Sequence, residues 1–422
     1  MKNDFDVIVF GAGTAGIVAA VQAARAGAST LLVEKNALPG GTMTAGGSGF
    51  PGLFYAWKKQ VIAGIGWELV TGAAAESGIS LPAFEEQIGM ENHSAYQIKI
   101  NQVIYGAFGE EKMAEAGVEL LYHTMAAEVK TLPDGAEVTL CTLEGLQKFH
   151  AKRLIDCTGD AAAAALAGFE VIHPFPCQPA TYSCFLHGYD CSSIDRQALE
   201  EAAGKAVAAG ELRYTDLGWS NQRFSDRILR THGGNSNHIF PVLPTYTSHG
   251  RTLLEQEGRS SLLRAWRFLR RQKGLENIQI SPGAFECGVR ESAVIKGIYT
   301  ITAEDYITAK KFPDALCNAF YPIDLHCENG VTPRRLQEGA VPQVPLRALI
   351  PQGSACLIAA GRCISSDRTA NSALRVQATA MATAQAAAAA ACISIEEDVP
   401  LSQASVPKIH ALLKQHGAIA PE

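Results

Sequence analysis

The sequence predicts an α/β protein in which a nucleotide-binding domain is interrupted by a second, α+β domain. A glycine-rich turn follows an apolar strand at residues 5–10, and a second strand-and-turn of this kind occurs at residues 355–362. The long stretch between them mixes helix and strand patterns. We therefore expect the first domain to comprise residues 1–173 and 353–422, and the inserted domain to comprise residues 174–352.

Length and composition exclude several classes of protein. The 422 residues are 47 % hydrophobic and 18 % charged, which allows a large buried core and excludes a disordered chain. The formal net charge is −6, so nothing attracts the chain as a whole to nucleic acid or to an anionic membrane.

Two apolar stretches could be mistaken for membrane signals. The run at residues 7–21 follows Asp4 and Asp6, where a signal peptide would carry positive charge. The alanine-rich run at residues 373–391 contains Arg375 and several Gln and Thr residues, so it falls short of a spanning helix. We expect a cytoplasmic protein without membrane insertion.

The eleven cysteines are scattered and match no metal or disulfide pattern. Even the regular spacing of Cys177, Cys184 and Cys191 fits no known ligand signature, and we expect these three to be buried hydrophobic residues. No metal site is predicted.

The first chemical motif is the glycine turn after the strand at residues 5–10. Gly11 permits a tight turn, Gly13 lets the backbone approach a pyrophosphate, and Gly16 lets the helix at residues 17–27 pack closely. A second strand, residues 30–33, ends at an acid that can accept hydrogen bonds from ribose hydroxyls. The predicted cofactor contacts are Gly11, Gly13, Thr14, Ala15, Gly16, Glu34 and Lys35. This motif alone does not separate FAD from NAD.

A second glycine cluster follows at once, with Gly40, Gly41 and Thr42 and then four more glycines up to residue 52. It is too long for a simple turn. Backbone without side chains suits a long ligand that lies across it.

A third segment ends in Thr158, Gly159 and Asp160 after a run of predicted strands. These strands are expected at residues 117–123, 127–132, 136–143, 146–151 and 153–160, with a hairpin at Asp134 and Gly135. The last strand would bring Thr158 beside the first glycine loop. The segment is either a ligand contact or a plain turn from strand to helix.

The fourth segment is the strand at residues 355–360, followed by Gly361, Arg362, Ser365 and a long helix that carries Arg375 and Gln377. A helix N-terminus aimed at the cofactor would favour negative charge there.

Together these segments resemble the FAD-dependent oxidoreductases of the FAD-oxidored family, which are related to the glutathione-reductase and succinate-dehydrogenase flavoproteins. The matching segments are residues 7–34, 40–52, 153–168, 285–305 and 346–389. The resemblance implies a Rossmann-like domain of the glutathione-reductase type with FAD as cofactor. No His lies between residues 40 and 51, where some distant relatives attach FAD covalently, so we expect noncovalent binding.

The inserted domain lacks a second dinucleotide fingerprint, so the flavin must exchange electrons directly with a substrate and with a second donor or acceptor. We expect strands at residues 181–187 and 237–242 and helices at residues 195–209 and 250–272. Arg264, Arg267 and Arg271 share one face of the last helix, which is either a solvated face or a surface that recognises an anion.

Histidines are the candidates for proton transfer, because their ordinary pKa suits a general base. His232, His238 and His249 lie in or near a polar loop, and His238 is favoured because a strand could fix its orientation. His326 is a weaker candidate. Arg290 either holds a substrate anion or forms an interface ion pair with Glu291.

The sequence therefore predicts an FAD enzyme that transfers a hydride between the flavin and a small polar organic substrate. Two alternatives stay open. One is a non-redox flavoprotein, such as a hydratase or isomerase, that uses FAD for structure or orientation. The other is a nucleotide-binding module without chemistry. The expected partners are a small molecule, an unknown second redox partner and possibly a second copy of the chain.

Overall fold

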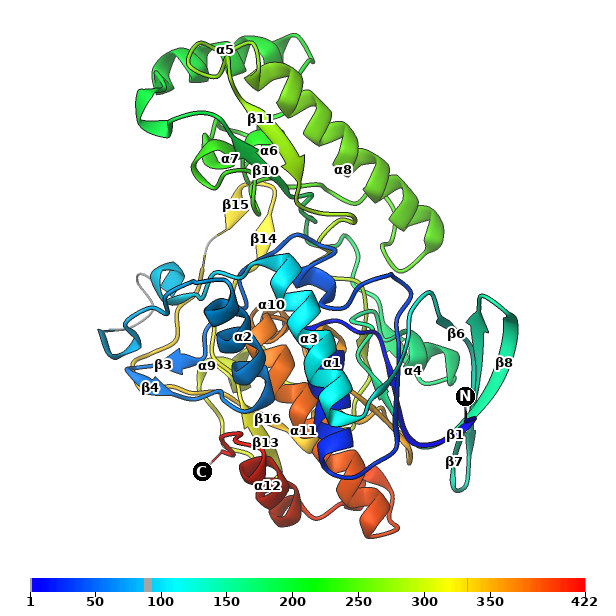
Figure 1. The fold of residues 1–422 in the computed structure, drawn as a ribbon. Helices are drawn as coiled ribbons and strands as arrows, with labels where there is room; N and C mark the ends of the chain where they lie inside the picture. Colours follow the sequence, from blue (N-terminus) through cyan, green and yellow to red (C-terminus); the bar gives the residue numbers. More distant parts are fainter. Residues whose placement is uncertain (1, 87–92, 332, 422) are drawn as a thin grey trace.

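A mixed seven-stranded sheet organises the body of the molecule in the computed structural model, which describes residues 2–86, 93–331 and 333–421 (Figure 1). Five of its strands run parallel in the order β5, β2, β1, β8, β17. Their bounds are Glu119–Leu121, Thr30–Val33, Asp4–Phe10, Gly145–Asp156 and Leu357–Ala359. The predicted strands at the fingerprint and at the return segment are thus confirmed, and all five carboxyl ends point to one edge.

The antiparallel part of the sheet is made by β6 (Met125–Leu132) and β7 (Gly135–Thr142), joined by the predicted hairpin. β7 pairs with the first half of β8, and β17 pairs with its second half. The strands predicted at residues 146–151 and 153–160 are therefore one continuous strand, which ends at Asp156, because β8 pairs with β7 along its first half and with β17 along its second half.

The side chains of β1 point alternately to the two faces of the sheet and so belong to two hydrophobic clusters. Val7 and Val9 belong to one hydrophobic cluster, and Ile8 and Phe10 belong to the other. The first face is covered by α1 (Thr14–Arg25), α2 (Ile65–Glu76), α3 (Gln102–Ala116) and α11 (Gln377–Glu396). The second face is covered by the short α4 (Ala162–Leu166).

Helices α1 and α11 pack closely because both present small side chains. Ala19 and Ala23 on α1 and Ala387 on α11 are fully buried in the same cluster. α11 is the one helix among the described residues that is long and apolar enough to cross a membrane, yet 83 % of its apolar stretch is buried inside the protein. It is a core helix.

The long helix predicted after residue 361 is interrupted. α10 (Arg368–Leu374) begins at Asp367, whose side chain accepts from the Ala370 N–H, and α11 begins only after Val376, whose backbone is extended. The Ala378 N–H donates to Pro51 O instead of continuing α10. Arg375 therefore lies at the break between two helices.

A smaller lobe lies above the body (Figure 1). It has a hydrophobic cluster of its own, formed within residues 184–278. Its elements are β10 (Cys184–His187), α5 (Arg196–Ala208), α6 (Tyr214–Leu217), α7 (Arg227–Arg230), α8 (Ser248–Leu269) and β11 (Gln279–Pro282). The predicted helices α5 and α8 are confirmed. The strand predicted at residues 237–242 is wrong, because only Ile239 pairs there, in a single bridge to Ala180.

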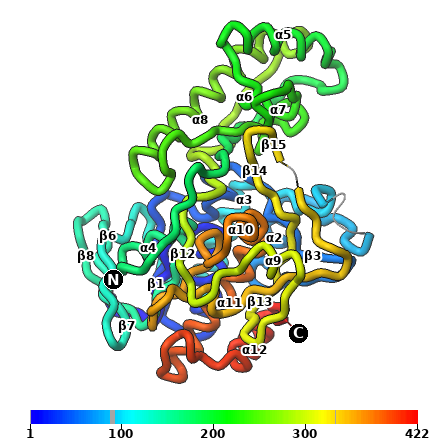
Figure 2. Tube along the Cα trace, turned by 180° about the vertical axis from the view of Figure 1, so that it is seen from behind, coloured from blue at the N-terminus to red at the C-terminus, as the bar shows by residue number. Residues whose placement is uncertain are grey.

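Other parts of residues 174–352 pack within the body. Leu316, Phe320, Leu346 and Leu349 join the cluster on the first face of the sheet. The remaining elements are β3 (Tyr55–Ala56), β4 (Lys59–Gln60), β9 (Val171–Ile172), β12 (Val294–Ile295), α9 (Ala303–Ile307), β13 (Ala315–Asn318), β14 (His326–Cys327), β15 (Gly330–Val331), β16 (Gln343–Pro345) and α12 (Val406–Gln415). The hairpin of β14 and β15 reaches from the body toward the lobe in both views (Figure 1, Figure 2).

Candidate active site

A cavity of about 1770 Å³ is lined by the carboxyl ends of the parallel strands and by residues of the lobe. Ligand sites of drug-sized molecules usually span roughly 300–1,000 Å³, so this cavity has room for an extended cofactor and a second molecule. The predicted cofactor residues that line it are Gly11, Gly13, Thr14, Ala15, Glu34, Lys35, Gly41, Thr42, Thr158, Gly159, Asp160, Gly361, Arg362, Arg375 and Gln377. Segments from both ends of the chain therefore share one cavity.

The glycine loop lines the cavity with bare backbone. A Cβ on Gly13 would meet no protein atom within 4 Å, so the space beside it is open for a ligand. A Cβ on Gly16 would lie 1.8 Å from Gly11 O, so Gly16 serves the packing of α1 and does not line the cavity. Gly40 is also outside the lining, and its N–H donates to Ala12 O at 2.7 Å. Gly40 therefore supports the first glycine loop through this backbone hydrogen bond.

Glu34 joins the end of β2 to the glycine loop. Its Oε2 accepts from the Ala12 N–H at 2.7 Å, and its Oε1 accepts from the Asn36 N–H at 2.9 Å. Only 6 % of the residue is exposed, and this burial raises the pKa of the carboxyl above its ordinary value. Lys35 next to it pairs with Glu286 across the cavity mouth, at 3.0 Å.

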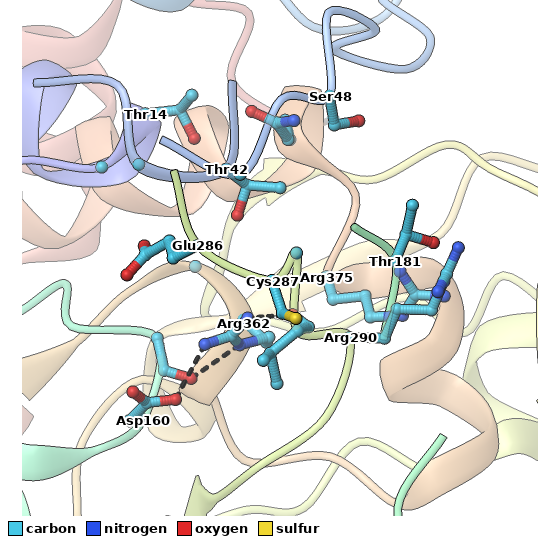
Figure 3. A pocket seen from close by; sticks show the side chains of 18 of the residues that line it. Thr14, Thr42, Ser48, Asp160, Thr181, Glu286, Cys287, Arg290, Arg362 and Arg375 are labelled. Atoms are coloured by element: carbon cyan, nitrogen blue, oxygen red, sulfur yellow. Dashed lines mark hydrogen bonds and ion pairs between the residues drawn. The ribbon is translucent and has the colours of Figure 1, made fainter. Parts of the chain in front are cut away.

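Arg362 connects the fourth predicted segment to the third. Its Nε donates to Gly159 O at 2.7 Å and its Nη2 donates to Asp160 Oδ1 at 2.8 Å (Figure 3). The Thr158 side chain is held by the end of β8, because its hydroxyl donates to Asp156 Oδ1 at 2.7 Å. The third and fourth segments thus meet at the cavity.

Ser365 does not line the cavity. It is fully buried, and its Oγ accepts from the Gly297 N–H at 3.0 Å. The hydroxyl therefore holds the segment after β12, which is a structural contact.

Two polar atoms at the start of α11 lack a partner in the described chain. They are Nε of Arg375 and Oε1 of Gln377, and both residues line the cavity. Arg375 is tethered through its Nη2, which donates to Asp324 O at 3.1 Å. A buried polar atom without a partner is costly, so this end of the cavity fits the polar edge of a ligand.

Arg290 lies on the opposite side of the cavity from the glycine loop (Figure 3). Its Nη1 donates to Pro179 O at 2.7 Å and its Nη2 donates to Asn235 Oδ1 at 2.8 Å. Burial, with the positive charge of Arg375 nearby, lowers the pKa of Arg290 to about 9, so the guanidinium stays charged at neutral pH. Glu291 pairs with Arg368 at 2.9 Å, so it does not form the ion pair with Arg290 that the sequence left open.

Asp324, His326 and His238 are linked by two consecutive hydrogen bonds. His326 Nε2 lies 3.1 Å from Asp324 Oδ2, and His326 Nδ1 lies 2.7 Å from His238 Nε2. Burial lowers the pKa of His326 to about 3 and that of His238 to about 2, with the charge of Arg290 adding to both shifts, so both rings are neutral at pH 7. His326 lines the cavity, whereas His238 lies behind it.

The other two candidate histidines are less well placed. His232 lines the cavity at the lobe, where its Nδ1 lies 3.3 Å from Leu186 O and its ring stacks on Tyr189. His249 is exposed and lies outside the cavity lining.

The arginine face of α8 is used by ion pairs. Arg264 Nη2 lies 2.8 Å from Asp216 Oδ1, and Arg271 pairs with Glu211 at 3.0 Å. Arg264 and Arg271 are therefore held by carboxylates of the protein.

Sequence reasoning missed Arg227, Asn235, Trp219 and Asp324 as cavity residues. The only available signal was the local excess of arginine around residues 213–271. No periodicity marks which of those arginines turn inward, since Arg227 lies on a helix of only four residues.

A glycine loop, an acid at the end of the second strand and a returning strand that share one cavity define a dinucleotide-binding enzyme fold. The model of the FAD dependent oxidoreductase family matches residues 6–413. The chain therefore belongs to this family, whose cofactor is FAD and whose members are enzymes. A search of curated proteins found no matching relative.

Several solved structures share parts of the shape. A geranylgeranyl bacteriochlorophyll reductase-like protein from Thermoplasma acidophilum is 15 % identical over 98 % of this chain and 84 % of that chain, with a TM-score of 0.46. The anhydrotetracycline hydroxylase OxyS from Streptomyces rimosus is 19 % identical over 47 % of this chain, with a TM-score of 0.32. The match spans only 41 % of the hydroxylase. Glycine oxidase from Geobacillus kaustophilus is 13 % identical over 44 % of this chain and 63 % of that chain, with a TM-score of 0.30.

Proposed function

We propose that the protein binds FAD noncovalently in the large cavity and transfers a hydride between the flavin and a small polar organic substrate. The observation that carries this proposal is the continuity of the cavity. It runs from Gly13 and Glu34 to Arg290 and His326, and its volume of about 1770 Å³ exceeds what one ligand of ordinary size fills.

The residues that would hold the cofactor fit its chemistry. Glu34 lines the cavity at the end of β2, where a carboxylate accepts from ribose hydroxyls. Gly13 and the first turn of α1 offer open backbone to a diphosphate, since helix N-termini favour anions. Gln377 Oε1 and Arg375 Nε, both without partners, suit the polar edge of the flavin ring.

FAD, when bound, supplies a centre that accepts or donates a hydride. The chain supplies the surroundings. Arg290 and Arg375 place fixed positive charge beside the substrate end of the cavity. Asp324 accepts the Nε2–H of His326, so the Nδ1 lone pair of His326 accepts from His238 Nε2–H. These hydrogen bonds orient Asp324 and His326 at the cavity.

The same proposal includes finer features of the fold and the setting. We assign the body to the glutathione-reductase type and residues 174–352 to an inserted segment that carries the substrate-binding lobe, and we place the enzyme in the cytoplasm. The electrons pass to or from a second redox partner that is not part of this chain.

The visible spectrum of the purified protein tests the cofactor, and anaerobic bleaching tests the reaction. We expect a yellow protein whose flavin absorbance falls when one of a panel of hydroxy, amino or unsaturated acids is added without oxygen. A flavin that stays oxidised with every such acid and with every artificial reductant would contradict hydride transfer. Turnover without any electron acceptor would favour a hydratase or isomerase instead.

A further inference from the structure

Three guanidinium groups gather at the substrate end of the cavity. Arg227, Arg290 and Arg375 come from the lobe, the segment after β11 and the break between α10 and α11, respectively, and all three line the cavity. Figure 3 shows the side chains of Arg290 and Arg375 at the same end, beside Thr181. Three separate parts of the fold thus bring positive charge to one place.

One residue orients two of these arginines. The Asn235 side chain accepts from Arg290 Nη2 at 2.8 Å through Oδ1, and its backbone O accepts from Arg227 Nε at 3.2 Å. The same backbone O accepts from Trp219 Nε1 at 3.2 Å. Asn235 has a φ of +38°, a left-handed conformation that Asn tolerates better than most residues. Asn235 therefore fixes the geometry of the pair.

Much of the hydrogen-bonding capacity of these arginines is unused. The Arg227 guanidinium lies over the Trp219 ring, with its Cζ 3.5 Å from the ring centroid, and within the described chain the one hydrogen bond that this guanidinium donates is from Nε. Arg375 has an unpartnered Nε. A guanidinium carries five N–H donors, so donors on all three groups are left for a ligand.

The charges around these arginines do not balance. Asp324 is the carboxylate that faces them, 3.6 Å from Arg375. His238 and His326 are neutral at pH 7, because burial holds the pKa of each far below its ordinary value. The other nearby carboxylates are already paired, Glu291 with Arg368 and Asp160 with Arg362 and Arg251. Two positive charges are left over, and burying them is costly unless an anion joins them.

We propose that the substrate is a small organic dianion, with two carboxylates or with one carboxylate and one phosphate-type group, bound by Arg227, Arg290 and Arg375. The inference rests on the proposed function, because the arginines lie at the substrate end of the same cavity. The inference adds the net charge of the substrate, because hydride transfer alone does not require an anion. Asn235 is a positioning residue that acts through Arg227 and Arg290.

Binding to the FAD-loaded, full-length protein tests the charge class. The probes are butanedioate, 3-phosphonopropanoate, butanoate and butanediamide, and their dissociation constants are measured by calorimetry and by the change in the flavin spectrum. We expect at least one dianion to bind about tenfold or more tightly than butanoate, and butanediamide not to bind. The better of the two dianions identifies the second anionic group. Equal binding of butanedioate, 3-phosphonopropanoate and butanoate overturns the proposal.

Three variants assign the site. Arg227→Gln and Arg290→Gln should each weaken the dianion by about tenfold or more while FAD content stays normal. Arg270→Gln removes the same charge from the exposed face beyond α8 and should change nothing. If Arg290→Gln does not fold, the half-buried Arg227 still decides the question. Unchanged dianion affinity in Arg227→Gln overturns the assignment.

The proposal can fail separately from the proposed function. If a neutral or monoanionic substrate bleaches the flavin, hydride transfer is supported and the dianion proposal is contradicted. If the protein does not bind FAD, the proposed function is contradicted. Calorimetry still measures whether the arginines bind a dianion.

Discussion

The two sides of the cavity are lined by different chemical groups. The side of the cofactor consists of glycine backbone, helix N-termini and small residues around Gly13 and Gly361, whereas the facing side consists of buried charged and aromatic side chains such as Arg290, Arg227 and Trp219. The first side recognises shape and backbone, and the second recognises charge. The comparison teaches that the two sides should respond to different changes, the first mainly to added side-chain volume and the second mainly to charge and pH.

The largest expected effect is the loss of stability in acid that comes from the charged side. The pKa values of His238 and His326 are depressed below the unfolded value near 6.5, so the unfolded chain binds more protons between about pH 6.5 and pH 3. The stabilisation is therefore present above pH 6.5 and is lost as the pH falls. One such histidine costs about 1.4 kcal/mol per pH unit well below pH 6.5 and about half of that at pH 6.5, which gives about 2 kcal/mol for each histidine between pH 6.5 and 4.5.

Urea unfolding of the wild type and of the His238→Gln/His326→Gln variant at both pH values measures this effect. The difference between the two proteins cancels the other titrating groups, including Glu34, whose pKa is raised. Asp324 contributes only below its unfolded pKa of about 3.9, outside the window. Parallel pH profiles in the two proteins would show that the buried histidines do not titrate as described.

The next effect comes from the glycine side. Gly13→Ala should fold normally, because the added Cβ meets no protein atom within 4 Å, yet the methyl group enters the space of the diphosphate. We expect a loss of about 2 kcal/mol in FAD binding, roughly thirtyfold, measured by fluorescence titration of the apoprotein with FAD. Gly16→Ala is the contrasting control, since its Cβ would lie 1.8 Å from Gly11 O and should prevent folding. Normal FAD affinity in Gly13→Ala would place the diphosphate elsewhere.

Glu34→Ala should have a smaller effect on the same side. It removes the acceptor of two backbone N–H groups and the expected partner of the ribose, and we expect FAD affinity to fall by about tenfold. Glu34→Gln keeps an acceptor and should lose less. Unchanged cofactor content in the alanine variant would show that the ribose lies away from β2.

The smallest effect separates structure from binding. Ser365→Ala removes the acceptor of the Gly297 N–H and should cost about 1 kcal/mol of unfolding free energy without changing FAD affinity. Thermal unfolding and FAD titration of one preparation measure both. A selective loss of FAD would restore Ser365 as a cofactor contact.

The sequence predicted the glycine side well because its signals are local. Strand, glycine turn, helix and acid follow one another within residues 5–34, and each has a backbone reason at its own position. The break at Arg375 was not predicted, because it depends on a hydrogen bond from Ala378 to the distant Pro51. The strand expected for His238 was wrong, since the polar loop before it is held by Asn235 and not by a sheet.

The charged side was hardly predictable, because its residues meet only in the folded chain. Asn235 and Asp324 come from separate segments without a motif, whereas Arg290 was a candidate because it lies in the family-like segment at residues 285–305. His326 ranked below His238 in sequence, yet only the fold shows that His326 lines the cavity and His238 does not.

The shared cavity also constrains when the enzyme can mature. Gly361 and the start of α11 complete the wall that Gly13 begins, and α1 packs directly on α11. A chain that lacks α11 lacks part of that wall and exposes the face of α1 that packs on α11. We therefore expect the cofactor to be captured only after the chain has been synthesised through α11.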